Sequence, residues 1–178
     1  MRQTGTTLPE MMTVLAAVAI MLSIALPGMS TLMDSRVLSA ATNDILASLH
    51  LARSESIKRG SRAVLCPSED GNVCSGEGWH SGWLVFQDLN NNAARDDGEA
   101  LIQSRPALPA GIRLTGNQFV SNYISYAPNG GTKLVGGFLQ AGTLTVCREA
   151  ESPTRARRLI ISTTGRVRTI KLDLANCP

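Results

Sequence analysis

The feature that most constrains this chain is an uncharged stretch near the N-terminus. No charged residue occurs between Glu10 and Asp34, and Met11–Leu26 is almost wholly apolar. A helix needs roughly 20 apolar residues to cross the ~30 Å hydrocarbon core of a bilayer, and this stretch is long enough. Arg2 precedes it, which favours a cytoplasmic N-terminus and an exported remainder. The sequence therefore predicts one membrane-spanning helix that carries a domain outside the cytoplasm.

A cleaved secretory signal peptide is the main alternative for this stretch. Such a peptide ends in a small-x-small cleavage site, whereas this run ends in Leu26-Pro27-Gly28 without an A-x-A pattern. We therefore expect the segment to be retained.

The residues that follow have the periodicity of an amphipathic helix. Apolar side chains recur every four positions, at Val37, Ala41, Ile45 and Leu49. We expect a helix that resumes near Leu32, after a break at Pro27-Gly28, and ends at Arg59 before Gly60. Its apolar stripe should face the sheet of a globular domain.

Beyond Gly60 the pattern changes to short strands separated by Gly, Pro and Asn. One long helix followed by a run of strands indicates an α+β fold with a mostly antiparallel sheet or sandwich. The predicted strands are Arg62–Cys66, Gly82–Gln87, Ala100–Ser104, Gly111–Thr115, Asn122–Tyr126, Thr143–Arg148, Arg157–Ser162 and Arg166–Leu172.

Four cysteines are present: Cys66, Cys74, Cys147 and Cys177. None forms a C-x-x-C pair and the chain has only 2 histidines, which makes a zinc site improbable. An even number of cysteines in an exported chain favours two disulfides, with three possible connectivities. We favour Cys66–Cys74 and Cys147–Cys177. Four buried thiols would be expected if the domain were cytosolic.

The N-terminal residues resemble a known processing signal. Gly5-Thr6-Thr7-Leu8-Pro9-Glu10 followed by an apolar helix is similar to the type III signal of type IV pilins and type II secretion pseudopilins. The resemblance implies that a prepilin peptidase cuts after Gly5 and leaves Thr6 as the first mature residue, a site of N-terminal methylation. Glu10 is then the fifth mature residue, and Pro27 occupies the position of the helix-kinking proline of pilins.

The resemblance also implies a role for the Glu10 carboxylate. In a filament it would pair with the α-amine of a neighbouring subunit and set the stagger between subunits. The alternative is that Glu10 only favours the positive end of the helix dipole. Residues 1–5 are thus expected to be a leader peptide, 6–33 a transmembrane helix, 34–60 its amphipathic continuation and 61–178 a periplasmic β-rich domain of type IV pilin-like fold.

Two further blocks resemble minor pilins of the GspH, FimT and FimU kind. The first is Asp44–Ser56, in the helix, and the second runs from Gly78 to Asn90 with Gly98-Glu99 after it. The second block holds Trp79 and Trp83, which we expect to be core or edge-covering aromatics and not ligand platforms.

The segment after the second tryptophan has the spacing of a calcium loop. Acidic and amide side chains fall at positions 1, 3, 5, 9 and 12 of an EF-hand-like pattern: Asp88, Asn90, Asn92, Asp96 and Glu99. The sixth position is Ala93, where the sharp turn normally requires glycine. We therefore favour a polar hairpin over a calcium site and expect no metal or other cofactor.

The positive charge of the chain is concentrated near the C-terminus. Six basic residues and no acid lie between Glu151 and Asp173: Arg155, Arg157, Arg158, Arg166, Arg168 and Lys171. The chain has 17 basic residues in all, so the rest of the chain holds 11 basic residues and all 14 acidic ones. Thr163-Thr164-Gly165 supplies a turn between two strands, and Arg166 and Arg168 should project from one face with Arg155 and Lys171 beside them.

Gly165-Arg166-Val167-Arg168 resembles the Gly-Arg-x-Arg motif of FimT-type pilins, in which this region binds DNA during natural transformation. Guanidinium groups form charge-assisted contacts with phosphate, so double-stranded DNA is a possible partner. The alternatives are solvated strand ends and contacts with a neighbouring pilin.

Histidines and cysteines suggest no catalytic site. His50 lies in the predicted helix and His80 beside the tryptophans, and neither has an evident partner in the sequence. We predict a structural protein of the bacterial inner membrane: a minor pilin, closest to the FimT type, that joins or primes a type IV pilus with other pilins. The alternative is minor pseudopilin H of a type II secretion system.

Overall fold

The computed structural model describes residues 7–149 and 153–178, and for residues 24–34 it describes the backbone but not the side chains. The chain divides into two compact units, Met1–Val37 and Leu38–Pro178. The second unit contains every strand of the described residues and is called the head domain below.

One helix, α1 (Leu8–Arg59), contributes to both units. The predicted break at Pro27-Gly28 and restart near Leu32 are wrong, because α1 is continuous through these positions. Proline removes one intrahelical hydrogen bond, and a long helix rich in Ala, Leu and Met has enough favourable residues to continue past it. The predicted end is confirmed: α1 stops at Arg59, and Gly60 takes a left-handed φ of 62°.

All eight predicted strands are present in the described part of the head domain, most with ends shifted by one or two residues. Their bounds are β1 Arg62–Pro67, β2 Trp83–Asp88, β3 Leu101–Arg105, β4 Ile112–Gly116, β5 Ile124–Tyr126, β6 Gly142–Arg148, β7 Thr154–Ile161 and β8 Val167–Leu174. A short 3-10 helix, η1 (Trp79–Ser81), precedes β2. The α+β class expected from the sequence is therefore confirmed.

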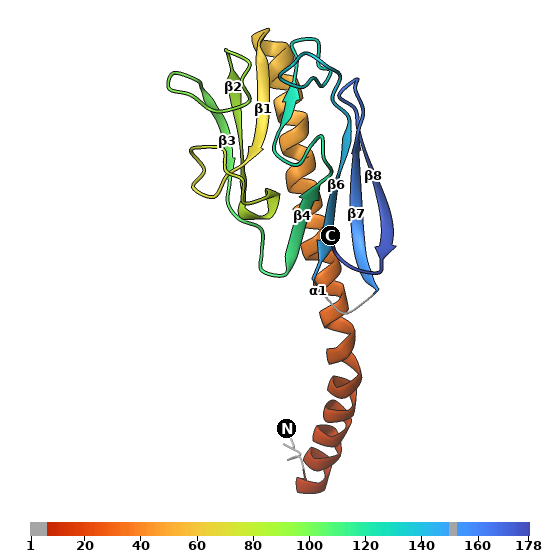
Figure 1. The fold of residues 1–178 in the computed structure, drawn as a ribbon. Coiled ribbons are helices and arrows are strands. Elements are labelled where there is room, and N and C mark those ends of the chain that lie inside the picture. Colours follow the sequence, from red (N-terminus) through yellow and green to blue (C-terminus); the bar gives the residue numbers. More distant parts are fainter. Residues whose placement is uncertain (1–6, 150–152) are drawn as a thin grey trace. The chain divides into compact units, whose positions relative to one another are not determined.

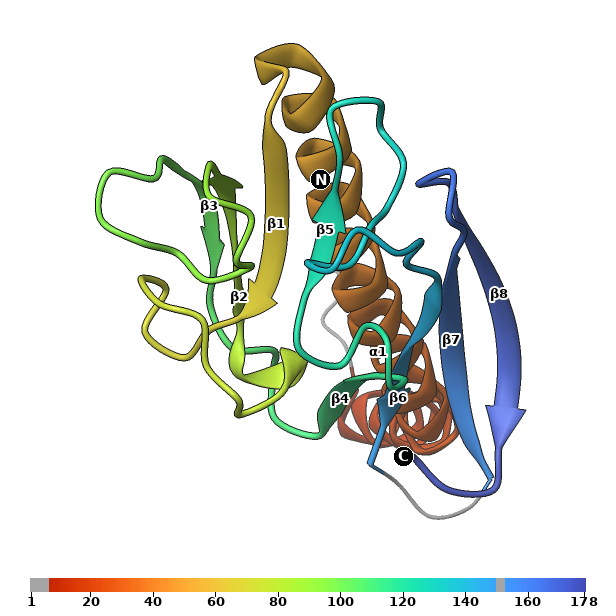
Figure 2. The same ribbon diagram turned by 45° about the horizontal axis from the view of Figure 1, so that its top comes forward.

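The strands form two antiparallel sheets, in the orders β3-β2-β1-β5 and β4-β6-β7-β8. The head-domain part of α1 lies between them, as Figures 1 and 2 show. Trp83 of the first sheet and Arg157 of the second both form hydrogen bonds to α1 serines. The helix thus serves as the common support of both sheets.

The core lies where the apolar stripe of α1 meets the sheets. Ala41, Ile45 and Leu49 are almost fully buried, as their spacing predicts. Trp79 and Trp83 are each 1% exposed, which confirms them as core aromatics. The indole N–H of Trp79 donates to the carbonyl oxygen of Val120 at 2.9 Å, so this buried polar group is satisfied.

Candidate functional site

The predicted assembly residues lie at the N-terminal end of α1. Gly5 and Thr6 fall outside the described residues, and so does the side chain of Pro27. Glu10 is exposed in the first helical turn, where its carboxylate lies 3.5 Å from the backbone N–H of Thr7. An acidic group there is favoured by the positive end of the helix dipole and remains accessible to another partner.

The first turns of α1 expose an unusual number of large apolar side chains. The exposed residues of this segment are Leu8, Met11, Met12, Val14, Leu15, Val18, Ile20, Met21 and Leu22. No helical stretch with described side chains combines the length and apolarity needed to cross a bilayer.

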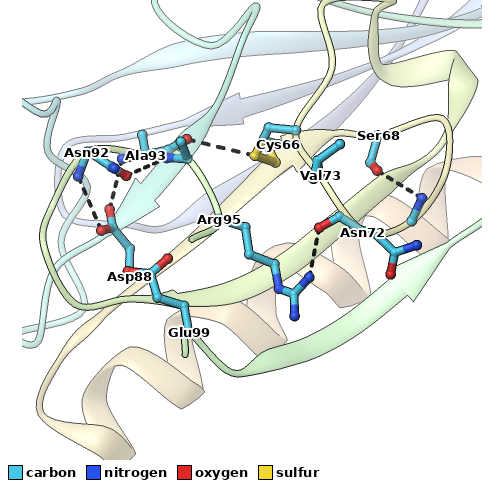
Figure 3. The surroundings of a disulfide bond; sticks show 12 residues. Cys66, Ser68, Asn72, Val73, Asp88, Asn92, Ala93, Arg95 and Glu99 are labelled. Atoms are coloured by element: carbon cyan, nitrogen blue, oxygen red, sulfur yellow. Dashed lines mark hydrogen bonds between the residues drawn. A yellow bond between two sulfur atoms is a disulfide. The ribbon is translucent and has the colours of Figure 1, made fainter. Parts of the chain in front are cut away.

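The segment 88–99 folds as a loop closed by its own hydrogen bonds (Figure 3). The buried carboxylate of Asp88 accepts the backbone N–H groups of Asn91, Asn92 and Ala93, at 2.6 to 3.2 Å. Glu99, 6% exposed, accepts the N–H groups of Leu89 and Asp96. Both acids thus bind backbone donors within the loop.

The amide side chains complete this loop. Asn90 and Asn92 each donate to Asp96 at 2.7 Å. Ala93 takes a left-handed φ of 59° at the position where glycine is usual. The tight turn imposes this backbone conformation. The loop is therefore held together by polar contacts among its own residues.

Two disulfides are formed, and they are the pairs favoured from the sequence: Cys66–Cys74 and Cys147–Cys177. The first joins β1 to the loop after it and packs against the 88–99 loop, because Cys74 lies 3.8 Å from the carbonyl oxygen of Ala93 (Figure 3). The second ties the end of the chain to β6. The first disulfide thus anchors the connection between β1 and β2, and the second anchors the C-terminal end of the chain.

The basic residues near the C-terminus lie on the β7–β8 hairpin, but the structure does not place them on one face. Cross-strand partners share a face of a sheet. Arg168 lies opposite Ile160 and Arg158 opposite Ile170, whereas Lys171 lies opposite Arg157 and Arg155 opposite Asp173. Because side chains alternate along a strand, Arg158 and Arg168 occupy one face, and Arg155, Arg157 and Lys171 the other.

The face that carries Arg155, Arg157 and Lys171 is the one toward α1. Its members include the buried Leu159 and Ile161, and the Arg157 guanidinium donates to Ser39 of α1 at 3.2 Å. The prediction that Arg155 and Lys171 border Arg166 and Arg168 is therefore wrong. The sequence already indicates that the basic residues are divided between the two faces of the sheet. Arg157 and Arg158 are consecutive, and consecutive strand residues point to opposite faces.

The outer face of this sheet carries a narrower basic group. It consists of Arg158, Arg166 and Arg168, which we call the outer arginine group. Arg166 and Arg168 are exposed, while Arg158 is half-buried and its Nε has no hydrogen-bond partner among the described residues. Three guanidinium groups in this arrangement can bind an anionic surface.

The histidines form no catalytic arrangement in the described part of the chain. His50 is exposed on α1, and His80 lies in η1 with its Nδ1 buried and unpaired.

Comparisons with known proteins give one consistent result. Residues 41–165 match the family model described as type II transport protein GspH. No curated protein sequence is similar enough to this chain to count as a relative.

Solved structures of pilin-like proteins share the fold at low identity. The type IV minor pilin FimU of Pseudomonas aeruginosa is 17% identical, with a TM-score of 0.62 over 82% of this chain and 98% of that one. A second crystal form of FimU gives 16% identity and a TM-score of 0.56, over 79% and 99% of the two chains. The minor pseudopilin EpsH of the Vibrio cholerae type II secretion system is 13% identical, with a TM-score of 0.51 over 74% and 94%.

The matched region includes the head-domain part of α1 from Ala41 onward and strands β1 to β7, and it ends before β8. The chain belongs to the family described as type II transport protein GspH, whose members are pilin-like structural subunits that assemble with other pilins and are not enzymes.

Proposed function

We propose that this chain is a minor pilin, closest to the FimT type, that joins or primes a type IV pilus. The observation that carries the proposal is the exposed apolar surface of α1 between Leu8 and Leu22. Apolar area of this extent costs about 25 cal/mol per Å² in water, so it requires lipid or other apolar helices around it. An inner membrane before assembly and a bundle of pilin helices afterwards both supply that environment.

In this proposal residues 1–5 are a leader, and residues 6–33 hold the subunit in the inner membrane with the head domain in the periplasm. Prepilin peptidase removes the leader after Gly5. The exposed carboxylate of Glu10 then forms an ion pair with the α-amine of a neighbouring subunit. The Gly78–Asn90 block, which resembles FimT and FimU, favours the pilus over a type II secretion system, and so does Gly165–Arg168, which resembles FimT-type pilins. A minor pseudopilin H is the alternative.

Processing and incorporation test the proposal separately. The full chain is expressed with a prepilin peptidase, and the mass of the purified product is measured with Gly5→Ala as the uncleaved control. We expect loss of Met1–Gly5 from the wild type alone. Glu10→Gln should then be cleaved but absent from sheared pili. Cleavage with incorporation into a secretion pseudopilus instead would favour the alternative.

DNA binding is a second candidate function, favoured by the outer arginine group. Arg166 and Arg168 are exposed on one face, and neither forms an ion pair with a described residue. Contacts between guanidinium groups and phosphates would give salt-dependent binding without sequence preference. The proposed DNA surface comprises Arg158, Arg166 and Arg168, with Arg155, Arg157 and Lys171 excluded because they lie on the opposite face.

A further inference from the structure

Strand β8 is an open sheet edge. It is the last strand of the order β4-β6-β7-β8, and in the described part of the chain it pairs only with β7. It has 8 residues, compared with 5 each in the edge strands β3 and β4. The remaining edge strand, β5, has 3 residues and is covered by a bridge from Tyr126 to Thr132. Figure 2 shows β8 along the outer side of its sheet.

The hydrogen-bonding pattern shows which backbone groups of β8 point outward. The N–H of Ser162 donates to the carbonyl oxygen of Arg166 at 3.0 Å, which makes these residues a hydrogen-bonded pair. In an antiparallel ladder hydrogen-bonded and non-hydrogen-bonded pairs alternate. The N–H and C=O groups of Arg168, Ile170 and Leu172 therefore point to β7, and those of Val167, Thr169, Lys171 and Asp173 point to the open edge.

The side chains of β8 are also incompletely covered. Ile170, Leu172 and Leu174 on one face and Val167 on the other are only half-buried. Thr169 is exposed. A further strand beside β8 would bury these apolar groups and at the same time satisfy the outward backbone groups, which is how extended peptides add to a sheet edge.

The charge along this edge selects the incoming strand. Arg166, Arg168 and Lys171 are exposed, and the one acid, Asp173, lies opposite Arg155. Two copies of β8 placed edge to edge would bring these like charges together, which is unfavourable. We infer that β8 accepts an extended, acidic segment of another chain as the fifth strand of its sheet. This inference concerns the head domain alone and does not depend on pilus assembly.

The test uses a fluorescein-labelled peptide of alternating valine and glutamate, equal in length to β8. Its binding to the full chain in detergent micelles is measured by fluorescence anisotropy. Thr169→Pro removes an outward N–H at an edge position that tolerates proline, and Thr169→Ala removes the same side chain but keeps the N–H. We expect Thr169→Ala to bind like the wild type and Thr169→Pro to bind at least about tenfold more weakly.

Two peptide controls use the unaltered protein and decide the question even if Thr169→Pro does not fold. Methylation of the peptide's backbone nitrogens should abolish binding, because the added strand loses its donors. A peptide of alternating valine and lysine should bind at least about tenfold more weakly than the glutamate peptide.

Equal binding of the Thr169→Pro and Thr169→Ala variants would overturn the inference, as would undiminished binding of the methylated or lysine peptide. So would loss of binding in Arg166→Ala/Arg168→Ala together with full retention in Thr169→Pro. That result would show a polyanion surface, such as one for duplex DNA, that recognises charge without strand pairing.

Discussion

The indole N–H of Trp83 on β2 donates a hydrogen bond of 2.9 Å to the hydroxyl of Ser48 on α1. The same hydroxyl lies 2.6 Å from the side-chain oxygen of Gln103 on β3. Trp83 and Ser48 are both buried, so the helix and the first sheet are joined by a polar contact inside the core. This contact fixes the position of α1 against the sheet more specifically than apolar packing does.

Removing the Ser48 hydroxyl should destabilise the head domain. Ser48→Ala leaves the buried N–H of Trp83 without an acceptor, which costs about 1–3 kcal/mol. Ser54→Ala is the matched control, because Ser54 is an exposed serine of the same helix that bonds only to the carbonyl of Leu51. Urea unfolding of the full chain in detergent, followed by circular dichroism, measures both. A lower midpoint in Ser48→Ala alone supports the contact, and equal midpoints contradict it.

The proposed DNA binding should depend on which face of the β7–β8 hairpin carries the arginines and not on charge alone. Arg166→Ala/Arg168→Ala and Arg155→Ala/Lys171→Ala each remove two positive charges, but from opposite faces of the sheet. We expect the first pair to weaken retention of duplex DNA in gels and to reduce the slope of log affinity against log salt by about 2. The second pair should leave both nearly unchanged. Equal losses from the two variants would indicate general charge attraction.

The order of the secondary structure elements could be predicted from the sequence, because apolar periodicity and glycines report on local structure. The stripe Ala41, Ile45, Leu49 and the end of α1 at Gly60 are examples. Of the three cysteine connectivities that the sequence left open, the favoured one is the one found.

Relationships between distant residues could not be predicted in this way. The contact of Arg157 with Ser39 depends on which face of β7 meets the helix, and only the tertiary fold decides that. The same holds for β8 as a sheet edge, since strand order is a property of the whole sheet. The continuity of α1 at Pro27 also departs from the local rule.

Among the described glycines with a left-handed φ, Gly165 in the β7–β8 turn should tolerate substitution least. Its φ is 74°, and a Cβ there would collide with the backbone carbonyl of Gly130 and lie 3.1 Å from the Tyr126 ring. Gly137 has a similar φ of 85° but open space around it. Gly137→Ala should cost about 1–2 kcal/mol from backbone strain. Gly165→Ala should cost about 1–3 kcal/mol more, from the collision.

Thermal unfolding of the two glycine variants side by side measures this difference. Because the strain of a left-handed φ is common to both, the additional loss in Gly165→Ala isolates the packing of the turn against residues 126–130. Similar melting temperatures would mean that the turn moves away without cost.

The two disulfides should contribute unequally to stability. Cys147–Cys177 closes a loop with a sequence separation of 30, and Cys66–Cys74 one of 8. The entropy removed from the unfolded chain grows with loop length and corresponds to about 3.6 and about 2.5 kcal/mol. Urea unfolding of Cys147→Ala/Cys177→Ala should therefore show the larger loss. A larger loss in Cys66→Ala/Cys74→Ala would mean that packing of that loop against Ala93 outweighs chain entropy.

The hydroxyl of Tyr126 is buried and has no hydrogen-bond partner among the described residues. Tyr126→Phe should therefore leave stability at neutral pH within about 1 kcal/mol of the wild type. Burial also raises the pKa of the Tyr126 phenol well above its ordinary value of 10.0, against a smaller opposing effect of Arg53. In the unfolded chain the phenol ionises near pH 10, while in the folded chain it keeps its proton.

The sign of the pH effect follows from this raised pKa. Below pH 10 the Tyr126 phenol is protonated in both the folded and the unfolded state. The contribution of its raised pKa to the free energy of unfolding is then fully present. Above pH 10 the unfolded state releases a proton that the folded state retains, so the wild type loses stability at about 1.4 kcal/mol per pH unit relative to Tyr126→Phe. Urea unfolding of both proteins between pH 8 and pH 11.5, at roughly half-unit steps, measures the difference. Parallel curves over this range would show that the Tyr126 hydroxyl reaches solvent or a partner in the folded protein.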